Sequence, residues 1–166
     1  MKQMIHAVAF AAALYAPHVL AHGDGGGTAK RSTRSLPMAA DETPFGRAGD
    51  PKEAARTVTV DMSDAMRFDP ATIQVRQGET VRFVVKNSGR TLHEMVLGTG
   101  KSLAEHAELM KKHPGMEHDE PHMLHVKPGT TEEMVWQFTK AGEFRYGCLI
   151  PGHYEAGMAG KVKVTK

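Results

Sequence analysis

The sequence contains a single cysteine, Cys148, and little net charge. One cysteine excludes a disulfide within the chain. The 21 lysines and arginines nearly balance the 19 aspartates and glutamates, which leaves a formal net charge of +2. A net charge this close to zero argues against nucleic acid as a partner. No repeat at solenoid spacing is visible, and 166 residues suffice for one domain with its own core.

A continuous apolar run of membrane-spanning length is also missing at the start of the chain. Residues 1–21 contain Lys2, an apolar stretch from Ile5 to Leu14, and an ending, Val19-Leu20-Ala21, of the kind that signal peptidases cleave. A membrane anchor would need roughly 20 apolar residues, and Pro17 interrupts the run too early. We therefore predict a secretory signal peptide, export to the periplasm, and no stable membrane insertion after cleavage.

Residues 22–55 are rich in glycine, proline and charged residues and have no apolar period. This composition predicts a flexible N-terminal segment. Cleavage after Ala21 would make His22 the new amino terminus, where its amine and imidazole could chelate a copper ion. The alternative is that His22 only begins a disordered tail.

Residues 56–166 have the pattern of an all-β domain. Short β-branched or alternating runs end at glycine-containing turns, which is typical of a sandwich or barrel. Met66 to Pro70 is expected to be an irregular connection. The predicted strands are Thr57–Met62, Ile73–Val75, Thr80–Lys86, Thr91–Leu97, Thr131–Phe138, Gly142–Cys148 and Gly160–Thr165.

One helix is predicted inside this framework, in an insertion at residues 102–125. Ser102 and Glu105 match a capping box, and the helix is expected to run to about Lys112 with Leu103, Ala107 and Met110 on one side. His106 on this helix is expected to be an ordinary surface residue.

A copper site is predicted from one loop and one strand. Cys148, His153 and Met158 follow each other with four residues between neighbours. A thiolate, two imidazoles and a weak axial thioether are the ligands of a type 1 copper site, and the second imidazole is assigned to His93. Zinc binds the same nitrogen and sulfur atoms and stays open chemically. Protease chemistry is disfavoured because nothing marks an Asn or Asp that would orient a Cys-His pair.

Around these ligands the sequence resembles the cupredoxins, the small blue or green copper proteins that include azurin and plastocyanin. The resemblance rests on residues 66–98 and 141–164 and covers the chain from about Arg56 to Lys166. It implies a Greek-key β-sandwich with copper near one end, held by His93, Cys148, His153 and Met158. Within the family, the chain is most similar to the periplasmic copper-tolerance cupredoxins of the CopI type.

Two positions depart from the azurin and plastocyanin pattern. Where that pattern has an asparagine that helps to fix the ligand loop and donates to the copper thiolate, this chain has Glu94, and an ionised carboxylate cannot donate. Where azurin has a glycine before the first histidine, this chain has Leu92. Hydrogen bonds outside the ligand set tune a metal, so both changes bear on colour and potential.

A second group of copper-binding side chains is predicted in the insertion. Histidines and methionines crowd into residues 113–125 beside acidic residues, and both types bind copper. The alternative is a solvated loop whose histidines titrate freely. The auxiliary candidates, besides His22, are His113, Met116, His118, His122, Met123 and His125.

The sequence therefore predicts an exported copper protein that cycles between Cu(II) and Cu(I). It is not expected to be an enzyme, and the one catalytic activity left open is a weak oxidation of Cu(I). Copper tolerance is the favoured role, on the strength of the CopI resemblance and the additional His and Met residues. Two other roles stay open: a soluble electron carrier that docks on a cytochrome or reductase, and a chaperone that delivers copper to an oxidase.

Overall fold

The computed structural model describes residues 41–114, 116 and 118–166. The predicted signal peptide, His22 and the first part of the predicted flexible segment lie outside the described residues. In the described part of the chain, no helix has both the length and the apolar character that a membrane crossing requires.

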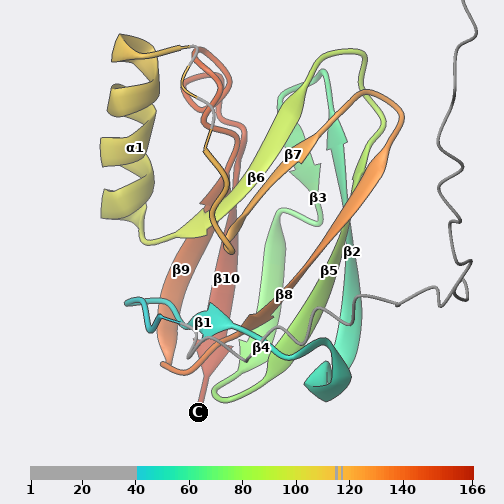
Figure 1. The fold of residues 1–166 in the computed structure, drawn as a ribbon, viewed down its shortest axis with the longest axis vertical. Helices are drawn as coiled ribbons and strands as arrows, with labels where there is room; N and C mark the ends of the chain where they lie inside the picture. The colour runs from blue at the N-terminus through green and yellow to red at the C-terminus, as the bar shows by residue number, and fades with distance from the viewer. Residues whose placement is uncertain (1–40, 115, 117) are drawn as a thin grey trace, which may run out of the picture. The chain divides into compact units, whose positions relative to one another are not determined.

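Two five-stranded sheets form the body of the fold (Figure 1). The strands of the first sheet are, in spatial order, β1 (Arg47–Ala48), β8 (Thr131–Gln137), β5 (Thr80–Asn87), β2 (Arg56–Ser63) and β3 (Arg67–Asp69). The central strand β5 pairs in parallel with β2 and antiparallel with β8, so that Phe83 lies between Val58 and Met134.

The second sheet contains the strands that position the predicted copper ligands. Its strands are, in spatial order, β4 (Thr72–Arg76), β10 (Ala159–Thr165), β9 (Gly142–Gly147), β6 (His93–Gly98) and β7 (Met123–Val126). β10 runs parallel to β4, whereas β9 pairs antiparallel with both β10 and β6. The ends of β6 and β9, which lead to His93 and Cys148, are thereby brought together although they are 55 residues apart.

The core lies between the sheets and follows from the two-residue period of the strands. In β6, Met95 and Leu97 enter this core, and Val96 points to the opposite side. The largest buried side chain, Trp136 on β8, donates its indole N–H to the carbonyl oxygen of Phe45 at 3.1 Å. The all-β prediction of a two-sheet sandwich with one helix in an insertion is confirmed.

Residues 41–55 contain regular structure, contrary to the prediction that the chain stays irregular up to Ala55. β1 pairs with β8, and a 3₁₀ turn, η1 (Pro51–Glu53), begins at Asp50, whose carboxylate accepts the N–H of Lys52. The physical reason is Phe45, which is only 5% exposed and stacks on Trp136 at 5.3 Å. One aromatic ring in a polar stretch thus fixes the segment to the sandwich.

Besides β1, two further strands, β3 and β7, were missed because their residues look like connections. Phe68 in β3 lies opposite Met62 of β2, and both are buried, so the stretch predicted as irregular extends the first sheet. β7 pairs with β6 along the histidine-rich segment because Met123 and Val126 are buried. The insertion, predicted to span residues 102–125, therefore ends earlier, where β7 begins at Met123.

The helix α1 (Gly100–Lys112) begins one turn before its predicted start. Thr99 and Ser102 form the capping box: Ser102 donates its N–H to the Thr99 hydroxyl at 3.0 Å, and Thr99 donates its N–H to the Ser102 hydroxyl at 2.9 Å. This pair satisfies two of the free N–H groups at the start of the helix, those of Thr99 and Ser102, so the predicted pair with Glu105 is wrong. The predicted apolar side of the helix is confirmed: Leu103, Ala107 and Met110 are buried. They form a second small core with Val96, Met123 and Leu149 on the outer side of the second sheet.

Candidate metal centre

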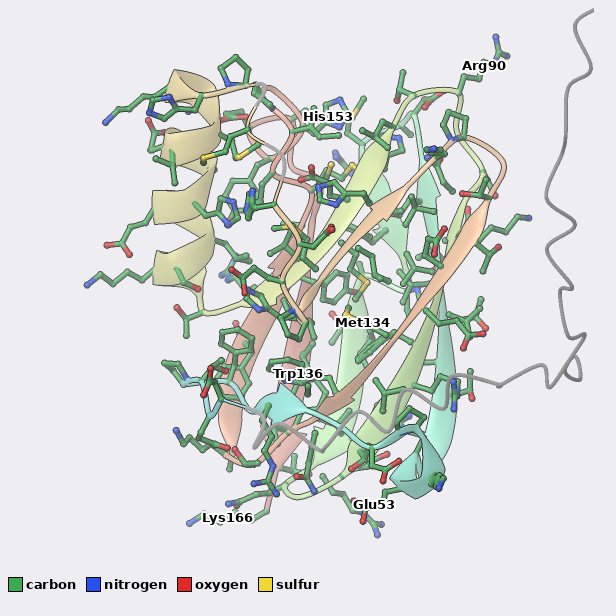
Figure 2. All side chains as sticks on the ribbon, in the orientation of Figure 1. Glu53, Arg90, Met134, Trp136, His153 and Lys166 are labelled. Carbon is green, nitrogen blue, oxygen red and sulfur yellow. The ribbon has the colours of Figure 1, made fainter. Side chains whose placement is uncertain are left out.

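Three predicted ligands meet at one end of the sandwich. His93 is the first residue of β6, Cys148 directly follows β9, and His153 lies in the loop that leads to β10. Figure 2 shows His153 at the end of the sandwich opposite Lys166, near the end of α1. The two strand ends are fixed by the pairing of β6 with β9, which places the first two side chains close together.

The ligand atoms have the spacing that a single metal ion requires. The Nδ1 atoms of His93 and His153 are 3.3 Å apart, and Cys148 Sγ lies 3.3 Å from His153 Nδ1 and 4.0 Å from His93 Nδ1. Three ligands placed around one ion at about 2.0 Å (nitrogen) and 2.3 Å (sulfur) have similar separations. The residues present therefore fit a mononuclear His₂Cys centre.

Burial differs between the ligands. His93 and Cys148 are completely buried, whereas His153 is half-buried. A buried thiol is difficult to ionise, and burial raises the pKa of Cys148 to about 12. Only a bound cation would hold it as a thiolate at neutral pH, which is what a metal ligand requires.

Asp64 orients His93 from the connection between β2 and β3. Its carboxylate lies 3.3 Å from His93 Nε2 and accepts the N–H of Arg90 at 2.8 Å. The Arg90 N–H and further hydrogen bonds from Thr91 lower the pKa of Asp64, so the carboxylate is ionised. A proton on Nε2 then faces Asp64, and the lone pair of Nδ1 faces Cys148 and His153. Sequence reasoning missed Asp64, because no local motif links it to a histidine 29 residues away.

Glu94 affects the thiol through its backbone. Its backbone N–H donates a hydrogen bond to Cys148 Sγ at 3.3 Å. The sulfur therefore still receives a hydrogen bond from this position, although the asparagine of the azurin and plastocyanin pattern is replaced by Glu94. The side chain of Glu94 lies 3.1 Å from His125 Nε2 instead. Burial raises the pKa of Glu94, and the charge of His125 opposes this shift. Leu92, the other departure, is 41% exposed.

Backbone hydrogen bonds close the ligand loop. Cys148 donates its N–H to the carbonyl oxygen of Met158 at 3.1 Å, and Met158 donates to that of His153 at 3.0 Å. Gly152 and Gly157 have φ angles of 92° and 90°, which favour glycine, so the loop can turn twice within a few residues. Met158 is completely buried at the end of this loop. Its role as axial ligand remains a prediction.

The auxiliary candidates in the insertion have different surroundings. His122 packs edge-on against the rings of Phe45 and Trp136, at 5.3 and 5.9 Å. Met123 is buried in the small core under α1. Both side chains make packing contacts in the structure. Their place in an auxiliary copper site stays a prediction.

The other candidates lie nearer to the surface. His113 is exposed where α1 ends, and Met116 is 39% exposed. His125 contacts Glu94, as described above. His118 is half-buried and lies against His106 of α1, with 2.9 Å between the two Nε2 atoms. The expectation that His106 is an ordinary surface residue is therefore wrong, because the chain after the helix folds back over it.

A cavity of about 890 Å³ lies between the auxiliary candidates and the ligand cluster. Its wall includes His153, Glu94, His125, His118 and two thioethers, those of Met110 and Met116. The cavity therefore runs from the half-buried copper ligand to the segment that follows α1.

Known proteins share the fold and the sequence. The profile of the family described as copper binding proteins, plastocyanin/azurin family, matches residues 54–165. The copper-resistant cuproprotein CopI of Rubrivivax gelatinosus is 61% identical over 123 residues, which cover 74% of this chain and 74% of the relative. The CopI of Pseudomonas aeruginosa is 37% identical over 149 residues, covering 72% and 82%. A reduced auracyanin from Roseiflexus castenholzii shares the fold with a TM-score of 0.59 at 21% identity, over 68% of this chain and 99% of that chain.

A two-sheet sandwich with a His-Cys-His cluster at one end defines a small mononuclear copper protein. The chain belongs to the plastocyanin/azurin family of copper-binding proteins. The predicted similarity to cupredoxins of the CopI type is confirmed by the two relatives of that name, and copper is the cofactor of the site.

Proposed function

We propose that the protein is an exported copper protein that alternates between Cu(II) and Cu(I) and serves copper tolerance in the periplasm, with Met158 as the axial ligand. The observation that carries the redox part is the cluster of His93, Cys148 and His153, whose ligand atoms all lie within 4.8 Å of one another. Bound copper supplies one-electron chemistry at such a site.

The chain's own residues favour redox exchange over catalysis. Asp64 and the backbone N–H of Glu94 hold two ligands in place from outside the cluster. Ligands held by a folded framework need little rearrangement when the charge of the ion changes. Burial keeps water away from Cys148, and half-buried His153 gives electrons a short path to the surface.

Copper tolerance is supported by the relatives named as copper-resistant cuproproteins. Deleting the gene should make cells sensitive to copper, and an intact copy should restore growth, whereas a copy with Cys148→Ser should not. Growth in copper that is the same with and without the gene would contradict the tolerance role.

An electron carrier is the second candidate, and the exposed surface beside His153 favours it. Leu92 and Pro151 are exposed and line the same cavity as His153, which gives a redox partner an apolar contact close to the copper ligand. A carrier should exchange electrons rapidly with a cytochrome or reductase, and Leu92→Asp should slow this exchange without changing the visible spectrum. A chaperone would instead transfer its copper to an oxidase.

A further inference from the structure

Two histidines outside the copper centre face each other between α1 and the segment that follows it. His106 lies in the middle of the helix, and His118 lies on the returning chain. Their Nε2 atoms are 2.9 Å apart, and the ring centroids are 4.8 Å apart at an interplanar angle of 40°. Both side chains are half-buried.

The surroundings keep His106 in the form that binds metals. Burial lowers the pKa of His106, and electrostatic interaction with the neighbouring imidazoles of His118 and His122 lowers it further. At neutral pH the imidazole is therefore neutral, with a lone pair on one ring nitrogen. His122 lies close enough to influence the pair, but its ring is packed against Phe45 and Trp136.

The spacing of the two nitrogens suits neighbouring ligands of a tetragonal ion. If each nitrogen lies about 2.0–2.1 Å from a metal, a separation of 2.9 Å corresponds to a ligand angle of about 90°. Tetragonal sites of nitrogen and oxygen ligands are typical of Cu(II) or Ni(II), and Cu(II) binds most tightly among the divalent first-row ions. A simple hydrogen bond between two neutral imidazoles has the same length, and experiment must distinguish these alternatives.

We propose that His106 and His118 form a second, exchangeable copper site that takes Cu(II). The charge of Glu120 acts on His106, whereas the carboxylate of Asp119 lies 3.8 Å from His125 Nδ1. Among the described residues, His106 and His118 are therefore the ligands of this site, and water would complete the coordination. The cavity that His118 lines reaches His153, so the second site opens towards the surface of the copper centre. No thiolate belongs to the pair, and half-buried imidazoles release an ion more easily than a buried His₂Cys set.

The test is a Cu(II) titration of the full protein whose type 1 site is already loaded. Copper is counted per chain, and electron paramagnetic resonance separates tetragonal nitrogen-ligated copper from the type 1 signal. His106→Ala and His118→Ala should each remove one tetragonal copper, or weaken its binding by more than about tenfold, because even residues behind the ligands change metal affinity by 10–100-fold. The matched control is His113→Ala, which removes an exposed histidine from the same segment and should leave this copper in place.

His106→Gln separates metal binding from structure. Glutamine can still hydrogen-bond to His118, so this variant should keep the stability of the wild type while losing the tetragonal copper. If His106→Gln and both alanine variants bind as much Cu(II) as His113→Ala, with the same affinity, the pair is only a hydrogen bond and the proposal is wrong. The type 1 absorption band should persist in all four variants, so a failure of this proposal is distinguishable from a failure of the proposed redox function.

Discussion

The copper centre and the pair formed by His106 and His118 both bring imidazole nitrogens within about hydrogen-bonding distance, yet the chain holds them differently. The Nδ1 atoms of His93 and His153 are 3.3 Å apart, and the Nε2 atoms of the second pair are 2.9 Å apart. His93 is buried on a strand and contacts Asp64, and the loop of His153 is closed by backbone hydrogen bonds. His106 and His118 lie instead on a helix surface and an irregular segment.

This difference suggests that the two regions bind copper for different purposes. A fixed, buried set of ligands retains its ion and restricts how the geometry changes with oxidation state. A half-buried pair on an added helix can bind and release an ion without disturbing the sandwich. Variants that affect one region and spare the other test this view.

The largest effect is expected from Cys148→Ser. The completely buried thiol is the only sulfur that can become an anion in the chain, and a serine hydroxyl cannot replace a soft thiolate ligand. The intense thiolate-to-copper absorption in the visible spectrum should disappear completely. Met116→Ala, which removes an exposed sulfur in the other region, should leave the band unchanged. A band that survives Cys148→Ser would refute the ligand assignment.

A large effect confined to the other region is expected from Leu103→Ala. Leu103 is 1% exposed and anchors α1 in its small core, so its truncation should lower the free energy of unfolding by about 2–5 kcal/mol. Chemical denaturation of the copper-free protein measures this loss. Leu109→Ala on the same helix is the control, since Leu109 is 44% exposed and should change stability by less than about 0.5 kcal/mol. The type 1 band should persist in both variants, and its loss with Leu103→Ala would show that the two regions are not independent.

Sequence reasoning was most successful where the information is local. Cys148, His153 and Met158 lie within one loop, and the strands were visible because alternation in the sequence mirrors burial in a sheet. The unusual combination of one cysteine with regularly spaced histidine and methionine made the metal recognisable.

It failed where contacts join distant residues. Asp64 meets His93 across 29 residues, and Phe45 meets Trp136 across 91. β7 is an extreme case, because its buried Met123 directly follows a run of polar residues that predicted a loop. His106 looked like a surface residue because the helix alone does not reveal what packs over it. The burial and the contacts of all these residues depend on tertiary pairing, which a short stretch of sequence does not reveal.

A smaller effect on the copper centre is expected from Asp64→Asn. The variant keeps the shape of the side chain but removes the negative charge that lies 3.3 Å from His93 Nε2. Residues behind metal ligands typically change affinity by about 10–100-fold, so copper binding should weaken to that extent and the visible band should shift. Competition with a chelator of known affinity measures the change. The control is Glu132→Gln, which removes an exposed charge on β8 and should change neither the copper affinity nor the visible band. If Asp64→Asn also changes neither, Asp64 does not position His93.

The smallest expected effect is a difference between the copper centre and the pair of His106 and His118 in how copper affinity depends on pH. Burial raises the pKa of Cys148 to about 12, so between pH 7 and 8 the copper-free thiol is protonated and copper must displace that proton. The apparent affinity of the buried centre should therefore rise with pH, by at most about tenfold per unit. The lowered pKa of His106 means that this imidazole is already neutral over the same range, so it adds no proton competition to the second pair. Proton release on copper loading in weak buffer, with more protons released per copper at the buried centre than for the additional tetragonal copper, would establish the contrast. Equal release per copper at both would contradict it.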